Sequence, residues 1–190
     1  RGLGDVYKRQ LPPQQTEDMA QIQVNRATCL MFTDRPLDAE QALNTALLFL
    51  DQSDDALNRG RAHTNLGSLY LRTGQVAAAL THFDRAAADL LNDDPRQADI
   101  LLLDRANAYL ALNLLPEALA ALEQCAALFF FEKESAPLGQ PYELAQTFYL
   151  RGWVHLRQGS GDLARTDLGR AAEIFRTPVS YTHLTLPTNR

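Results

Sequence analysis

The chain has 190 residues, 46% of them hydrophobic, and a formal net charge of −5. This acidic balance argues against a nucleic-acid platform, whose affinity would rest on a stripe of lysine and arginine side chains. No apolar run approaches the roughly 20 residues that a membrane-spanning helix needs. The two cysteines lie far apart in sequence, which favours a reducing compartment over a disulfide framework. We therefore expect a cytoplasmic protein without nucleic-acid or membrane partners.

The two ends of the chain, residues 1–10 and 179–190, resemble translated sequencing-adapter DNA. The segment DVYKRQ at residues 5–10 can be encoded by DNA whose reverse complement encodes VSYTH, the sequence at residues 179–183. Unrelated coding ends would not be reverse complements, so we interpret both as non-native tails and exclude them from the fold prediction. Without them four basic residues and one acidic residue are lost, and the net charge becomes about −8. The remainder is expected to be a fragment of a longer protein, with short natural tails as the alternative.

Four helical hairpins are expected between the tails, at residues 17–51, 56–91, 98–131 and 142–176. In each, apolar residues recur at helical spacing on both sides of a short turn. Pro36 opens the second helix of the first hairpin, where its fixed backbone angle is favourable. Gly74 and Asn113 stand at the next two turns, because both residue types tolerate a left-handed helix end. The connectors at residues 51–55 and 92–97 are rich in side chains that cap helices.

Small residues recur at fixed spacing through the four hairpins. Those in the middle of the first helices are Ala27, Gly67, Ala106 and Gly152. Twelve residues after each of them stand Ala39, Ala79, Ala118 and Ala164, and seven residues later Ala46, Ala86, Cys125 and Ala171. Helix axes about 8–10 Å apart tolerate only small side chains where they cross, so the pattern predicts closely packed helix pairs. We interpret Cys125 accordingly as a small core residue and not as a reactive thiol.

The second hairpin resembles the tetratricopeptide repeat (TPR) family through Leu66, Gly67, Tyr70, Gly74, Ala79, Phe83 and Ala86. The third and fourth hairpins keep much of this pattern, although His155 replaces the usual Tyr, and the first hairpin has Leu30 at that position. All four copies are longer than the minimal repeat of about 34 residues, and the extra residues fall in the connectors. Long, irregular repeats of this kind are similar to those that precede CHAT domains or occur in large bacterial signalling regulators.

The resemblance implies an all-α fold, a right-handed α-solenoid of about four hairpins whose first helices line a concave groove. Such grooves bind a peptide or helix of a partner protein. The groove residues are expected on the face of each first helix that is turned away from its own partner helix. They are Arg61, Thr64, Asn65, Ser68, Arg72, Leu103, Asp104, Asn107, Tyr149, Trp153 and Arg157. Trp153 is the strongest candidate, since Trp and Arg are enriched at binding hot spots. Packing between repeats is its alternative role.

No motif for catalysis or cofactor binding is present in the sequence. It contains no phosphate-binding loop, CxxC, HExxH or nucleophile elbow, so we expect no catalytic residues, cofactor or metal. The histidines His63, His82 and His155 show no metal-ligand spacing, and we expect separate, solvated or half-packed side chains. The phenylalanine run at residues 129–131 is expected to pack under the long connector, with a partner surface as the alternative.

Three hypotheses for function follow from this sequence. The first is a non-catalytic protein–protein interaction module whose partner is another protein or a domain of the same full-length chain. The second is a regulatory or sensor segment of a larger signalling enzyme, such as a CHAT-domain peptidase or an ATP-dependent regulator. The third is a structural spacer with an empty groove.

Overall fold

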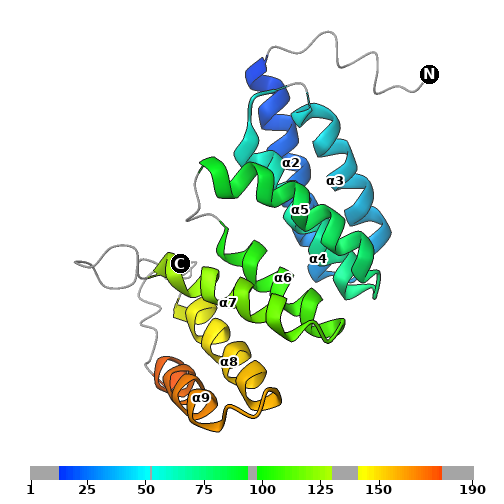
Figure 1. Cartoon of the computed structure of the whole chain (residues 1–190). Helices are drawn as coiled ribbons and strands as arrows, with labels where there is room; N and C mark the ends of the chain where they lie inside the picture. Colours follow the sequence, from blue (N-terminus) through cyan, green and yellow to red (C-terminus); the bar gives the residue numbers. More distant parts are fainter. Residues whose placement is uncertain (1–12, 52, 94–97, 130–140, 177–190) are drawn as a thin grey trace, which may run out of the picture. The chain divides into compact units, whose positions relative to one another are not determined.

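The computed structural model describes residues 13–51, 53–93, 98–129 and 141–176, and every regular element in these ranges is an α-helix (Figure 1). The helices are α2 (Pro13–Phe32), α3 (Pro36–Leu50), α4 (Ala56–Arg72), α5 (Val76–Asp93), α6 (Asp99–Ala111), α7 (Leu115–Phe129), α8 (Pro141–Arg157) and α9 (Gly161–Arg176). The predicted all-α fold of helical repeats is confirmed. The two adapter-like tails, Phe130, Phe131 and most of the long connector lie outside the described residues.

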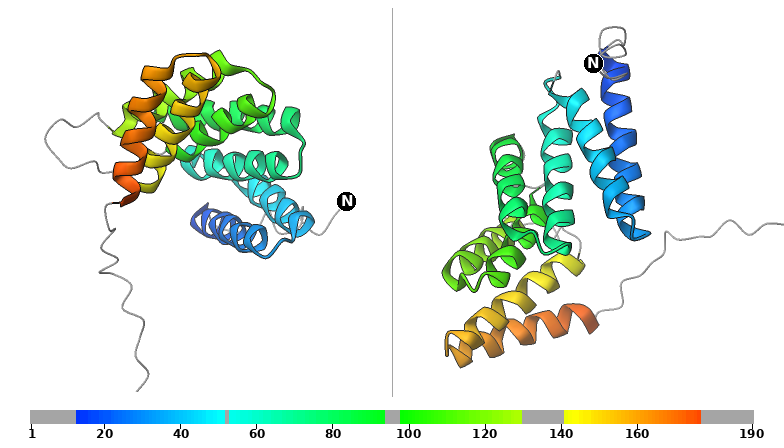
Figure 2. Two further views of the ribbon diagram at one scale, coloured as in Figure 1. Left: turned by 90° about the horizontal axis from the view of Figure 1, so that it is seen from below. Right: turned by 90° about the vertical axis from the view of Figure 1, so that its right-hand side faces the viewer.

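The chain divides into two compact units, Arg1–Ala121 and Leu122–Arg190, and the division falls within α7. In the first unit α2 packs against α3 and α4 against α5, while α3 contacts α4 and α5 contacts α6. In the second unit α8 packs along α9. Figure 2 shows the α4–α5 and α8–α9 pairs from two further directions. The right-handed coiling of the repeats stays a prediction.

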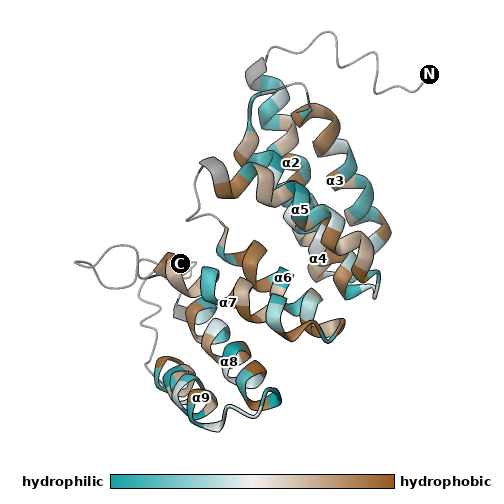
Figure 3. Cartoon of the chain, in the orientation of Figure 1, coloured by the Kyte–Doolittle hydropathy of each residue, from teal (hydrophilic) through white to brown (hydrophobic). Residues whose placement is uncertain are grey.

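The small residues of the repeating pattern lie buried within these helix pairs. Ala27 and Ala106 are fully buried, and Gly67 and Gly152 are buried as well. A Cβ on Gly152 would lie 2.8 Å from Cγ of Leu168, so α8 and α9 could not approach so closely with a larger residue there. Cys125 is fully buried, as predicted for a core position. Each helix also carries hydrophilic residues, which fits helices that bury one face only (Figure 3).

The four turns between paired helices share one backbone geometry. Each contains a residue with a positive φ angle: Asp34 (54°), Gly74 (78°), Asn113 (58°) and Gly159 (77°). In each turn the next residue donates its backbone N–H to a carbonyl five residues earlier, at 2.8–3.0 Å. This arrangement is typical of the left-handed helix end known as the Schellman motif. The turns expected at Gly74 and Asn113 are confirmed, and Asp34 takes the same role in the first hairpin.

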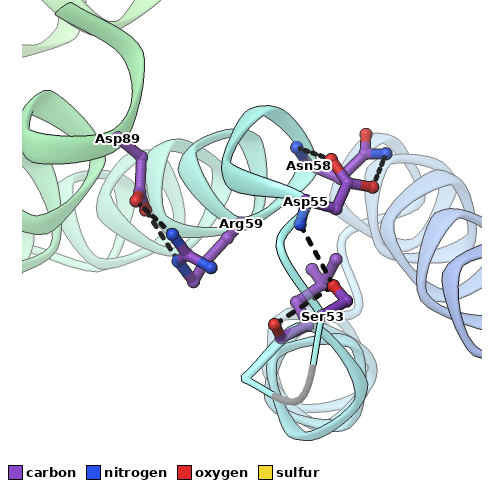
Figure 4. Close-up of polar contacts among 6 residues, drawn as sticks. Ser53, Asp55, Asn58, Arg59 and Asp89 are labelled. Carbon is purple, nitrogen blue, oxygen red and sulfur yellow. Dashed lines mark hydrogen bonds and ion pairs between the residues drawn. The ribbon is translucent and has the colours of Figure 1, made fainter. Parts of the chain in front are cut away.

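The start of α4 is capped by the connector that precedes it, as the sequence predicted. Asp55 Oδ1 accepts the backbone N–H of Asn58 at 3.0 Å, and Asp55 Oδ2 accepts the Asn58 side-chain amide at 2.6 Å (Figure 4). Ser53 Oγ accepts the backbone N–H of Asp55 at 3.3 Å. A carboxylate here satisfies a backbone donor that the helix leaves unpaired and complements the positive end of the helix dipole.

Candidate partner-binding face

Within the first unit, α4 lies between the first helices of the neighbouring hairpins and contacts both α2 and α6. Asn65 Nδ2 of α4 approaches Thr28 Oγ1 of α2 at 3.5 Å. Ser68 Oγ, one turn further along α4, donates a short hydrogen bond to Asp104 Oδ2 of α6. Three of the predicted groove residues, Asn65, Ser68 and Asp104, therefore lie where successive first helices meet. All three side chains remain partly exposed.

Asp104 of α6 is an acidic group whose pKa is shifted by burial. Burial raises its pKa above the ordinary value of 3.8, and the hydrogen bond from Ser68 opposes that rise. Its neighbours Leu101, Leu102 and Leu103 are buried. The carboxyl group thus combines a polar contact between two repeats with a site in which burial disfavours its ionised form.

Arg72 lies at the end of α4 beside a small pocket in the first unit. Its Nη1 donates to the backbone carbonyl of Met31 at 3.2 Å, which links the ends of α2 and α4. The pocket has a volume of about 90 Å³ and is lined by Met31, Asp34, Pro36, Leu69, Arg72 and Thr73. Arg61, near the other end of α4, is exposed.

In the second unit, Tyr149, Trp153 and Arg157 form a stripe along α8. They are four residues apart, so their side chains follow one face of the helix. Tyr149 is 49% exposed and Trp153 is 42% exposed. The guanidinium carbon of Arg157 lies 5.0 Å from the centre of the Trp153 ring, a cation–π distance. We call these three residues the α8 stripe.

Two side chains expected in the groove do not fit that role. Thr64 is 5% exposed, and its hydroxyl donates to the carbonyl of Gly60 in its own helix at 2.9 Å. Leu103 is 4% exposed. The prediction that these two residues contact a partner is wrong, because both side chains are buried. Asn107, one turn after Leu103 on α6, is partly exposed and keeps the expected position.

Residues 18–92, which include most of α2 and all of α3 and α4, match the family model described as Tetratricopeptide repeat. Repeats of this family mediate interactions between proteins. No curated protein matches the chain. The TPR resemblance of the third and fourth hairpins rests on their own residues and on the shared turn geometry.

A polar chain that the sequence did not predict crosses the matched TPR segment. His63 of α4 and His82 of α5 lie with their Nδ1 atoms 3.1 Å apart. The ring of Tyr70 lies 5.3 Å from that of His82, centre to centre, and the Tyr70 hydroxyl donates to Glu40 Oε1 of α3 at 2.6 Å. The expectation of separate histidines is therefore wrong for this pair, because the antiparallel α4–α5 hairpin brings the two rings together.

Two bidentate ion pairs join the helices of the second and fourth hairpins. Arg59 of α4 binds Asp89 of α5 at 2.6 and 3.1 Å (Figure 4), and Arg151 of α8 binds Asp167 of α9 at 2.7 Å through both oxygens. The carboxylate partner raises the pKa of each arginine. Sequence spacing could have revealed both pairs, because each is symmetric about its turn: fifteen residues on either side of Gly74 and eight on either side of Gly159.

The described residues show two further facts that bear on the kind of site present. Within them, no three His, Cys, Asp or Glu side chains come together in a way that could hold a metal ion. Among the helices the structure describes, none has the length and apolar character that crossing a bilayer would require. In the first unit, Asn65, Ser68, Arg72 and Asp104 offer hydrogen bonds and charge. In the second unit, the α8 stripe offers aromatic area and charge, and both kinds of chemistry are typical of binding surfaces.

Proposed function

We propose that this chain is a non-catalytic interaction module that binds a peptide or helix of a partner protein on its first helices. The observation that carries the proposal is the α8 stripe, in which two aromatic rings are more than 40% exposed on one helix face. Leaving Tyr149 and Trp153 in water forgoes the stabilisation of burying large apolar area, which a bound partner would recover. Arg157 beside the Trp153 ring adds a charged group of the type found at binding hot spots.

The first helices of the first unit support the same proposal. Asn65, Ser68 and Asp104 are partly exposed and held in place by contacts between repeats, while Arg61 and Arg72 are exposed. Side chains that are already fixed lose little freedom when a partner binds, so such a surface is preorganised. We include Asn107 on α6 in this face.

The proposal assigns a cytoplasmic location, because two cysteines far apart in sequence favour a reducing compartment. The partner is another protein or a further domain of the same full-length chain. No observation on the described residues favours the regulatory-segment hypothesis over the simple binding module, so the binding module is the function proposed.

A test begins with peptides selected from a random display library on the wild-type protein. Their affinities for Trp153→Ala and Arg72→Ala are then measured by fluorescence anisotropy of a labelled peptide. Because truncating a hot-spot residue costs 2 kcal/mol or more, we expect affinity to fall by roughly 30-fold for Trp153→Ala. Arg72→Ala is expected to weaken peptides that bind the first unit.

Leu163→Ala is the matched control, since Leu163 is also an exposed large apolar residue, at 55%, but lies on α9. This variant should bind every selected peptide like the wild type. Circular dichroism establishes that each variant is folded. Peptides that bind the folded Trp153→Ala and Arg72→Ala variants as tightly as the wild type would overturn the proposed face.

A further inference from the structure

The His63–His82 pair lies in the packed contact between α4 and α5. His63 is only 7% exposed, and His82 is partly buried. The Nδ1···Nδ1 distance of 3.1 Å is that of a hydrogen bond, and the ring centres are 5.3 Å apart. A ring-to-ring hydrogen bond requires one Nδ1 that carries a proton and one that does not. The observed geometry therefore excludes a state in which both rings are positively charged, because both Nδ1 atoms would then carry a proton.

Proton uptake by this pair has a direct structural cost. The first proton creates a cation in a site from which most water is excluded. The second proton leaves two N–H donors facing each other, with two positive charges about 3 Å apart. Both protonation steps are therefore unfavourable while α4 packs on α5. In an opened hairpin the two rings are hydrated and apart, so neither step carries this cost.

Charged groups of both signs face the pair. Arg85 of α5 disfavours protonation of both rings. Asp89 of α5 and Asp51, just after α3, favour protonation of His63, and Glu40 of α3 favours protonation of His82. Asp89 already binds Arg59 through both oxygens, and Glu40 already accepts the Tyr70 hydroxyl.

The balance of these effects favours neutral rings in the folded protein. Burial is the main cause that lowers the pKa of His63 from 6.5 to about 4, and repulsion from His82 and Arg85 adds to the effect. Burial is also the main cause that lowers the pKa of His82, and repulsion from Arg85 adds to it. A histidine whose pKa is lowered on folding adds to the free energy of unfolding. This contribution is complete above the pKa of the unfolded state, 6.5, and is lost as pH falls toward the pKa of the folded state.

We propose that the His63–His82 pair is an acid-sensitive joint: proton uptake separates α4 from α5 and opens the second hairpin, while the α8–α9 hairpin keeps its packing. In repeat proteins each hairpin contacts only its neighbours, so one hairpin can open locally. Because α4 carries Arg61, Asn65, Ser68 and Arg72, opening also removes that part of the binding face. This last consequence rests on the proposed function, whereas the opening itself does not.

Hydrogen exchange followed by mass spectrometry tests the joint without any partner. Exchange is compared at about pH 7.5 and about pH 5, after correction for the intrinsic exchange rate; at the lower value most carboxylates are still ionised. Proton linkage to His63 alone predicts that protection of α4 and α5 falls by about 30-fold between the two conditions. Protection of α8 and α9 should change by less than about 3-fold.

The decisive variant is the double substitution His63→Gln and His82→Gln, which keeps polar side chains but cannot take up protons. The fall in α4–α5 protection should disappear in it. His155→Gln is the matched control: His155 lies on α8, where Nε2 is 3.7 Å from Asp167, and its replacement should leave the α4–α5 response unchanged. An equal acid-dependent loss in the double variant would overturn the proposal, as would full protection of wild-type α4 and α5 at the lower pH.

A second measurement keeps the inference falsifiable if the double variant does not fold. Nuclear magnetic resonance of the wild-type imidazole C–H groups reports the titration of each histidine directly. The joint requires His63 and His82 to titrate below the ordinary histidine range. Titration of both rings at the ordinary value of 6.5 would overturn it.

Discussion

Gly67 of α4 faces the ring of Phe83 of α5 so closely that a Cβ on Gly67 would lie 2.2 Å from Cε1 of that ring. Phe83 is fully buried and is among the largest buried side chains described. A real Cβ does not approach another heavy atom so closely, so the absence of a side chain at Gly67 sets the separation of the two helices. The first prediction tests this contact.

Gly67→Ala should lower the free energy of unfolding by about 1–3 kcal/mol, because the buried ring must shift within a close-packed site. Gly169→Ala is the control: Gly169 lies within α9, and a Cβ there would meet no heavy atom within 4 Å. Alanine should raise helix stability at this open position by about 0.5–1 kcal/mol. Urea unfolding measures both variants. Equal effects of the two substitutions would contradict the packing argument.

Asp167→Asn should destabilise the α8–α9 hairpin by about 3 kcal/mol, because it leaves the Arg151 guanidinium without its carboxylate partner in a nearly buried site. The side chains of Asp167 and Arg151 are 5% and 17% exposed. Asp162→Asn is matched on the same helix, since Asp162 pairs with Arg165 but their side chains are 96% and 81% exposed. Thermal unfolding should show a much smaller change for Asp162→Asn, because an exposed ion pair and an exposed carboxylate in the first turn of a helix each contribute little. A similar loss in both variants would show that burial is not the cause.

Tyr70→Phe should lower the free energy of unfolding by about 1 kcal/mol, through loss of the hydrogen bond to Glu40. That bond is the main cause that raises the Tyr70 pKa to about 12. A raised tyrosine pKa gives stability that is complete below the unfolded value of 10.0 and is lost as pH rises through the folded value.

Alkaline unfolding curves distinguish this contact from a general effect. Wild-type protein should lose stability between about pH 10 and 12, and the Tyr70→Phe variant should lack that part of the loss. Tyr149→Phe, at an exposed position, should behave like the wild type. Identical alkaline profiles for the wild type and Tyr70→Phe would mean that the contact with Glu40 is absent in solution.

Asp104→Asn should be at least as stable as the wild type at neutral pH. Because burial raises the pKa of Asp104, the folded state favours the protonated carboxyl group. The contribution of that protonated group to the free energy of unfolding is lost as pH rises through the pKa of the folded protein. The asparagine is neutral at every pH and can still accept the Ser68 hydroxyl. Its stability advantage should therefore grow as pH rises above the ordinary value of 3.8.

Ser68→Ala provides the complementary measurement, because the Ser68 hydrogen bond favours the ionised form of Asp104. Its removal should raise the Asp104 pKa further, as measured by carboxyl-carbon resonance titration. A lower Asp104 pKa in Ser68→Ala would contradict the contact seen between α4 and α6.

The sequence was sufficient to predict the helices, three of their pairings (α2 with α3, α4 with α5 and α8 with α9) and the turns at Gly74 and Asn113. The repeated small residues such as Ala27 and Gly67 specify close crossings, and positive φ at Gly74 and Asn113 follows from the conformations that these residue types tolerate. These features depend on neighbours within one hairpin. The α8 stripe could be predicted for the same reason, since residues four apart share one face of a helix.

Apart from the two bidentate ion pairs, whose symmetric spacing about a turn is visible in the sequence, only the tertiary structure decided which polar side chains meet. The contacts of Ser68 with Asp104 and of Asn65 with Thr28 depend on how successive hairpins stack, which connector sequences do not fix. His63 and His82 lie at unequal distances from Gly74, so their meeting depends on the rotation of α4 against α5, which the packing of whole side chains determines.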